Sequence, residues 1–170
     1  YYSDGSTYTG QWMQEKPHGS GVERWSDGSL YEGAFHEGKK HGEGKFTWPG
    51  EGGGAYEGEF DNNDMHGEGS YKWSDGKVYK GQWNRNQMGA HGVMEWPDGK
   101  SYEGNFVDAK KHGEGTLTWP DGRSFEGQWE NGQQHGYGVV VSVKGQRRKS
   151  QWNQGSFVRW LEEPVKRDDH

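Results

Sequence analysis

Five histidines recur at equivalent positions of the chain and raise the question of a metal site. Each opens a His-Gly-x-Gly segment, and they are His18, His41, His66, His112 and His135. On successive hairpins they would form a row at intervals of about 10 Å, which is two strand spacings. Ligands of one metal ion must all lie within about 2 Å of it, so the row cannot share a metal. We therefore predict no metal site and expect each imidazole to hydrogen-bond loop backbone. A metal that bridges two molecules is the alternative.

Glutamates at matching positions are the candidates for acid–base chemistry. They repeat in register with the histidines and are Glu32, Glu57, Glu103 and Glu126. A catalytic site needs unlike groups that converge in one pocket, whereas a repeating surface offers the same group again and again. Paired with basic residues such as Lys45, these carboxylates would contribute under about 1 kcal/mol each. The His-Gly-x-Gly segments also lack the spacing of a phosphate-binding loop. We predict no catalytic residue, no cofactor and no enzymatic activity.

A basic run near the end of the chain is the third candidate. Lys144, Arg147, Arg148 and Lys149 place four positive charges in six residues. Such a cluster could contact anionic lipid, at about 1 kcal/mol per charge near a membrane surface. The alternative, which we favour, is that a degenerate terminal repeat has acquired solubilising residues.

These residues are positioned by an internal repeat with the signature aromatic–x–Gly–x–aromatic. Tyr31-Glu32-Gly33-Ala34-Phe35 is a typical copy, and copies start at residues 8, 31, 56, 79, 102 and 125. A degenerate seventh copy starts at 148, and residues 1–7 match the end of a further repeat, so we expect the chain to be a piece of a longer one. The repeat array is predicted over 1–155 and a separate short tail over 156–170.

Each copy predicts one β-hairpin. Because side chains alternate along a strand, Tyr31, Gly33 and Phe35 share one face. Left-handed turn conformations are expected in the middle of each copy, at Gly38, Asn63, Asn86 and Gly132. Asp-Gly pairs such as Asp27-Gly28 indicate a second tight turn. One hairpin cannot bury its own rings, but stacked hairpins form continuous ladders.

The composition agrees with this fold and excludes several classes of protein. Only 27% of the residues are hydrophobic, but 15% are aromatic and there are 31 glycines. Gly and aromatic residues in place of aliphatic ones favour sheet over helix. The net charge of −6 excludes the basic face that nucleic-acid binding requires. The chain has no cysteine and no apolar run long enough for a membrane span. We therefore expect a cytoplasmic protein, which could lie at the periphery of a membrane or a cytoskeletal structure.

The repeat has a period of 23 residues, with one interval of 25. This period and the residues Y-x-G-x-W/F…H-G-x-G…W-x-D-G resemble the MORN (membrane occupation and recognition nexus) repeat over about residues 1–155. The resemblance implies an all-β fold, an elongated single-layer twisted antiparallel sheet of stacked hairpins with a groove along one face. Proteins with similar arrays include junctophilins, plant phosphatidylinositol phosphate kinases and small cytoskeletal scaffolds.

A face of rings and glycines that no other layer covers predicts a binding groove. The expected function is a scaffold or adaptor that binds an amphipathic helix or extended peptide. The rival hypotheses are a regulatory or phospholipid-targeting module of a larger enzyme and a homodimerisation element of a cytoskeletal or membrane scaffold. We expect rings such as Tyr79 and Tyr102 to be partly exposed. The groove residues predicted from the central repeats are Tyr56, Phe60, Trp73, Tyr79, Trp83, Trp96, Tyr102, Phe106 and Trp119.

The tail carries an apolar pattern of its own. Phe157, Trp160 and Leu161 follow the i, i+3, i+4 spacing of a helical stripe, and Pro164 would end the helix. We predict a short C-terminal helix that docks on the last hairpins. Docking on a second copy, which would give a homodimer, is the alternative.

Overall fold

The computed structural model describes residues 2–161, in which every regular element is a β-strand. The chain divides into two compact units, Tyr1–Pro97 and Asp98–His170, and we describe each by itself. The first holds β1 (Thr7–Met13), β2 (Lys16–Arg24), β3 (Leu30–His36), β4 (Lys39–Thr47), β5 (Ala55–Asp61), β6 (Asp64–Lys72), β7 (Val78–Asn84) and β8 (Gln87–Glu95). The second holds β9 (Ser101–Val107), β10 (Lys110–Thr118), β11 (Ser124–Glu130), β12 (Gln133–Val141), β13 (Arg147–Asn153) and β14 (Ser156–Leu161).

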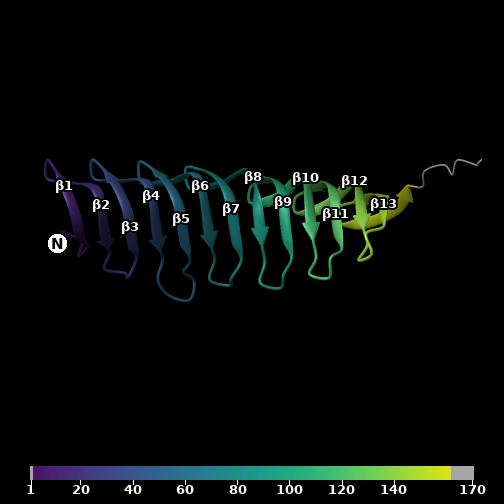
Figure 1. Ribbon diagram of the computed structural model, residues 1–170, viewed down its shortest axis with the longest axis horizontal. Helices are drawn as coiled ribbons and strands as arrows, with labels where there is room; N and C mark the ends of the chain where they lie inside the picture. Colours follow the sequence, from purple (N-terminus) through teal and green to yellow (C-terminus); the bar gives the residue numbers. More distant parts are fainter. Residues whose placement is uncertain (1, 162–170) are drawn as a thin grey trace, which may run out of the picture. The chain divides into compact units, whose positions relative to one another are not determined.

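Within each unit every strand pairs antiparallel with its neighbours in the sequence, and Figure 1 shows these strands side by side in chain order. One repeat is one hairpin, made of a seven-residue strand such as β3 and a nine-residue strand such as β4. Within each unit, the described strands contact their sequence neighbours, and no described element of that unit forms a second layer. The predicted all-β fold, an open antiparallel sheet of stacked hairpins, is confirmed.

The turn inside each hairpin has two residues, both with positive φ. Asn62 and Asn63 have φ of 48° and 75°, and Gly38 has φ of 82°. Two positive φ angles define the type I′ turn, whose twist matches that of the flanking strands. The left-handed conformation predicted for Gly38, Asn63, Asn86 and Gly132 is confirmed.

The Asp-Gly turns connect one hairpin to the next and are built differently. Gly28 donates its N–H to the Trp25 carbonyl at 3.0 Å, and the Asp27 carboxylate accepts the Ser29 N–H at 2.8 Å. Only Gly28 has a positive φ, of 94°. The glycine therefore supplies the left-handed residue, whereas the aspartate holds the turn through its side chain.

Paired glycines let the leading tyrosine of each hairpin lie flat on the sheet. Gly33 of β3 faces Gly44 of β4 across the hairpin. A Cβ atom on Gly33 would lie 2.6 Å from the Glu43 carbonyl oxygen, and one on Gly44 would overlap the Tyr31 ring. The Tyr31 hydroxyl donates to the Ala34 carbonyl at 2.7 Å. The ring thus fills the space that a side chain on Gly44 would occupy, while Gly33 lets the two backbones approach closely.

The predicted C-terminal helix is wrong for residues 156–161, which form the strand β14. Gln154 and Gly155 have φ of 46° and 85°, so they make the same two-residue turn as in the other hairpins. A one-residue bulge in β14 places both Phe157 and Trp160 on one face of the strand. The bulge therefore converts the two-residue period of a strand into an i, i+3 spacing that imitates a helix. The rest of the predicted helix lies outside the described residues.

Candidate binding face

The face that carries the glycines, here called the aromatic face, is floored by a row of buried rings. Tyr31 stacks edge-on against Phe35 of its own hairpin at 5.0 Å and against Phe60 of the next hairpin at 5.1 Å. Tyr56 repeats this pattern with Phe60 and Trp83. Edge-to-face contacts at these distances stabilise ring pairs beyond the area they bury. The leading tyrosines of these hairpins are fully buried, although nothing but neighbouring side chains covers them.

A second row of rings lies beside the first in unit 1 and is only half-buried. It comes from the ends of the nine-residue strands and the start of the wide turns. Successive ring centroids lie between 4.4 and 5.4 Å apart, so the row is continuous. We call it the half-buried row, and its members are Trp25, Phe46, Trp48, Tyr71 and Trp73.

The nine predicted groove residues divide between floor and surface. Trp73, Trp96 and Trp119 are half-buried. The other six, with 0–6% exposure, belong to the buried floor: Tyr56, Phe60, Tyr79, Trp83, Tyr102 and Phe106. The expectation that Tyr79 and Tyr102 are partly exposed is wrong, since both have 0% exposure. The reason is that the glycines leave room for these rings to lie down on the backbone.

Sequence reasoning missed part of the surface that remains accessible. Trp25, Phe46, Trp48 and Tyr71 were not among the predicted groove residues, although all lie in the half-buried row. The signal was available, because Phe46 and Trp48 follow Gly44 at the two-residue period of one face. What the period cannot reveal is which of two ring rows on the same face is covered.

A lysine lies between the two rows. The Lys40 Nζ atom is 5.3 Å from the centre of the Trp25 ring, 5.7 Å from that of Phe46 and 5.8 Å from that of Tyr31. Burial lowers the pKa of the Lys40 amine, and the nearby Glu23 opposes this effect. Burial also raises the pKa of the Glu23 carboxyl, against the effect of Lys40. The aromatic face therefore holds a partly desolvated cation.

The histidines lie at the edge of the sheet where the two-residue turns are. His18 Nδ1 accepts the backbone N–H of Glu37 at 3.3 Å, and His66 and His135 bond the turn of the following hairpin in the same way. The expected bonds to loop backbone are thus present at three of the five histidines, and they join neighbouring hairpins. No group of three or more potential metal ligands occurs among residues 2–161.

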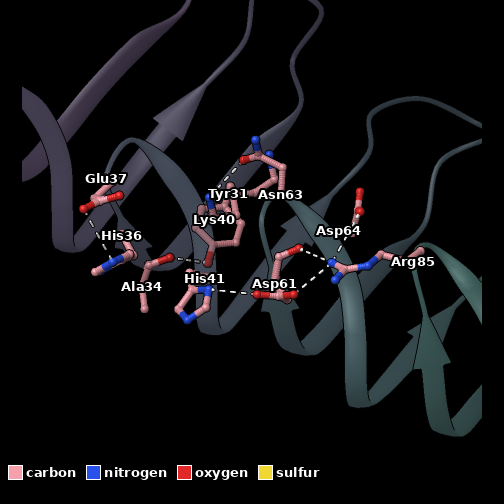
Figure 2. A network of polar contacts seen from close by, with 10 residues as sticks. All are labelled: Tyr31, Ala34, His36, Glu37, Lys40, His41, Asp61, Asn63, Asp64 and Arg85. Atoms are coloured by element: carbon pink, nitrogen blue, oxygen red, sulfur yellow. Dashed lines mark hydrogen bonds and ion pairs between the residues drawn. The ribbon is translucent and has the colours of Figure 1, made fainter.

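A polar network continues along this edge in unit 1 (Figure 2). His41 Nδ1 lies 3.3 Å from the Asp61 carboxylate, and the Arg85 guanidinium lies 2.9 Å from Asp61 and 3.8 Å from Asp64. The Asn63 side chain accepts the backbone N–H of Lys40 at 2.9 Å. Each contact joins one hairpin to the next, so the network orders the turns and fixes the backbone that presents Lys40.

Comparison with protein families decides what kind of repeat this is. The MORN repeat pattern matches residues 8–30, 31–52, 56–78, 79–101, 102–122 and 125–147. These matches start at the six predicted repeat starts and cover most of the chain. The chain belongs to the MORN repeat family. A comparison with curated proteins found no relative that matches it.

MORN repeat proteins are in general not enzymes, and the repeats are associated with membrane contact. A repeat sheet of this kind fits a protein or membrane interaction module. In the part of the chain that the structure describes, no helix is long and apolar enough to cross a membrane.

The register glutamates of the MORN array lie on the opposite, polar face. Glu32 and Glu57 both stand opposite Lys45, one from each neighbouring strand. Glu126 bonds the Arg147 guanidinium at 2.6 Å. These are the solvated cross-strand arrangements that the sequence predicts.

The basic run is divided between the two faces of β13. Arg147 and Lys149 lie on the polar face, whereas the Arg148 guanidinium lies 4.0 Å from the centre of the Trp160 ring on the aromatic face. Lys144 is exposed in the preceding turn. The four charges that were considered as a lipid-binding patch are therefore not gathered on one surface.

The apolar residues of the tail are divided in the same way. Phe157 contacts Trp152 at 5.6 Å and Trp160 at 4.9 Å on the aromatic face, where they remain 45% and 37% exposed. Leu161 pairs with Lys149 on the polar face. Phe157 and Trp160 thus extend the ring row of unit 2 over a seventh hairpin, and Leu161 does not.

Proposed function

We propose that this MORN array is a non-enzymatic scaffold or adaptor module that binds a protein segment along its aromatic face. The observation that carries the proposal is the half-buried row, a continuous strip of rings that no described element covers. Exposed aromatic surface of this extent typically marks a binding site. We place the module in the cytoplasm, where it can lie next to a membrane or a cytoskeletal structure.

The rigid floor suits such a surface. The rings beneath are held by edge-to-face contacts and hydroxyl bonds, so the half-buried rings have fixed positions before a partner arrives. Preorganised aromatic anchors lose little conformational entropy on binding. A helix with apolar residues at i, i+3 and i+4, or an extended peptide with alternating apolar residues, could place its apolar side on Phe46, Trp48 and Tyr71.

Two other functions are the rivals of this proposal. Membrane contact, as a targeting module of a larger enzyme, is favoured by the association of MORN repeats with membranes. Its predicted basic patch, however, is divided between two faces. Homodimerisation is favoured by the exposed Phe157 and Trp160 of the last hairpin.

The experiment is a selection of short peptides from a display library on the full chain, followed by hydroxyl-radical footprinting with the selected peptides. The proposal predicts that bound peptide protects Trp48 and Trp73 and leaves Tyr137, which is 54% exposed on the polar face, unprotected. Protection of Tyr137 alone, or failure to select any peptide, would refute it. Binding to phosphatidylserine vesicles without peptide binding would support the membrane function instead.

A further inference from the structure

One position of the repeat holds an apolar residue in some hairpins and a charged or polar residue in others. The second residue after each two-residue turn pairs with the second ring of its hairpin on the aromatic face. Met65 and Met88 are two of its apolar versions, and both pair with a ring. Over the seven hairpins, the position holds Pro17, Lys40, Met65, Met88, Lys111, Gln134 and Phe157. Packing alone is thus satisfied by methionine, and the two lysines need another explanation.

Lys40 has charge in its surroundings but no ion pair. Its amine faces Trp25, Tyr31 and Phe46, and Glu23 and Asp64 influence it only through longer-range electrostatics. Among residues 2–161, no carboxylate oxygen lies within 4.0 Å of Nζ. The amine has already lost much of its water on folding, so a carboxylate that reached it would gain attraction at a lower desolvation cost.

The same sign of charge recurs along the aromatic face. On its described strands the charged residues are Lys40, Lys111, Arg148 and the single acid Glu23. Lys111 lies 5.8 Å from the Tyr102 ring centre and 5.4 Å from that of Trp129. In the wide turns, Lys77 lies over Trp73 at 4.7 Å, and Arg123 lies over Trp119 at 5.5 Å but also pairs with the Asp121 carboxylate at 2.7 Å. The described strands of this face thus carry three basic residues and one acid, in a chain whose net charge is −6.

We propose that the aromatic face selects a partner segment that carries a carboxylate side chain among its apolar anchors, and that Lys40 in unit 1 binds that carboxylate. This inference rests on the proposed function and specifies the chemistry of the partner. Apolar side chains of the segment contact the half-buried row, while an Asp or Glu reaches the amine between the two ring rows. Charge complementarity of this kind determines which partner binds more than how tightly it binds.

An acidic protein segment fits better than an anionic membrane, because Lys40 is recessed. Its Nζ lies within cation–π distance of three rings, so an anion must approach on a flexible arm to reach it. A side-chain carboxylate has such an arm. Lipid phosphates lie in a plane and suit lysines that extend into solvent, such as Lys39 on the opposite face.

The test uses a library of amphipathic peptides with fixed apolar positions and random polar positions. It is selected in parallel on the full chain and on two variants, Lys40→Met and Lys39→Met. Methionine is the residue that two other hairpins carry at the position of Lys40, so the variant should fold. We expect Asp and Glu to be enriched on the full chain and on Lys39→Met, and the enrichment to be lost on Lys40→Met. A selected peptide should lose roughly tenfold in affinity when its Glu becomes Gln, and Lys40→Met should abolish that difference.

The outcomes distinguish this inference from the proposed function. Peptides that bind the aromatic face without acidic enrichment, or whose Glu-to-Gln change has equal effect on both variants, would overturn the role of Lys40 and leave the binding face intact. Absence of any selected peptide would overturn both. If no acidic peptides are enriched, and Lys40→Met weakens binding to phosphatidylserine vesicles, the ligand of Lys40 is an anionic membrane, and the inference of an acidic segment is wrong.

Discussion

The tyrosine that leads each hairpin has a double role at the scale of single residues. Its ring lies above two paired glycines. Its hydroxyl donates a hydrogen bond to the carbonyl three residues ahead, as Tyr102 does to Asn105 at 2.8 Å. Phe125 occupies the same position without a hydroxyl and is also buried. The ring is therefore required for the fold, and the hydroxyl adds to it.

Burial of these hydroxyls predicts loss of stability at alkaline pH. Burial raises the pKa of Tyr79 and of Tyr102 to about 12. Above pH 10 the unfolded chain releases these protons and the folded chain retains them, so the free energy of unfolding falls as pH rises. Each tyrosine contributes a slope of up to about 1.4 kcal/mol per pH unit. Tyr102→Phe should cost about 1 kcal/mol at neutral pH and lose less stability than the unchanged chain between pH 10 and 12. Urea denaturation across this range measures both, and equal losses would contradict the prediction.

Ala109 predicts a stabilising substitution. It has φ of 62° in a two-residue turn, in the left-handed region where a Cβ atom is disfavoured. Ala109→Gly should raise the free energy of unfolding by about 1 kcal/mol. The matched control is Gly132→Ala in the next hairpin, where a Cβ would meet nothing within 4 Å and φ is 82°. Gly132→Ala should lower the free energy of unfolding by about the same amount. An unchanged denaturation midpoint for Ala109→Gly would show that the turn carries no strain.

At the scale of single residues, the sequence predicts the backbone conformation of turns better than it predicts the exposure of side chains. Gly38 and Asn63 could be assigned left-handed turns because their chemistry tolerates that conformation. The complete burial of Tyr79 and Tyr102 could not be predicted, because it depends on how far a ring lies down over the glycines of the partner strand. Alternation assigns a side chain to a face and does not say what covers it.

At the scale of the element, the hairpin depends on close approach of two backbones. In β5 and β6, a Cβ on Gly58 would lie 2.5 Å from the Glu68 carbonyl oxygen. Gly58→Ala must therefore separate the strands and displace the Tyr56 ring, so we expect a loss above about 3 kcal/mol. Gly52→Ala in the neighbouring loop, where a Cβ would meet nothing within 4 Å, should change little. Comparable losses from the two substitutions, measured by thermal denaturation, would disprove the role of the glycine pair.

The strands and their starts could be read from the repeat, and the seventh hairpin could not. Arg148 and Ser150 replace its ring and glycine, and the bulge of β14 gives Phe157 and Trp160 a helical spacing. The decisive signal was Gln154-Gly155, which falls one repeat after Asn131-Gly132 and adopts the same positive φ angles. A turn in register outweighs an apolar pattern of three residues, because a bulge alters the pattern and leaves the turn in place.

At the scale of the molecule, the two faces of the sheet differ in chemistry. The polar face carries register glutamates opposite lysines, whereas the aromatic face carries rings and recessed cations. The sequence predicts which face carries the rings, because aromatic residues and glycines alternate with polar residues along each strand. It does not predict which rings stay accessible, since buried and half-buried rings such as Trp83 and Trp73 share one residue type.

The measurement that tests the central claim most directly is the affinity and stability of three variants, using peptides selected on the full chain. Trp73→Ala changes the half-buried row, Trp83→Ala changes the floor, and Glu57→Ala changes the polar face. We predict that Trp73→Ala weakens binding by tenfold or more, on the order of 1.4 kcal/mol, with a smaller loss of stability than Trp83→Ala. Trp83→Ala should lose about 3 kcal/mol or more of stability, and Glu57→Ala should change neither quantity. Full affinity in Trp73→Ala, together with lost affinity in Glu57→Ala, would contradict the account.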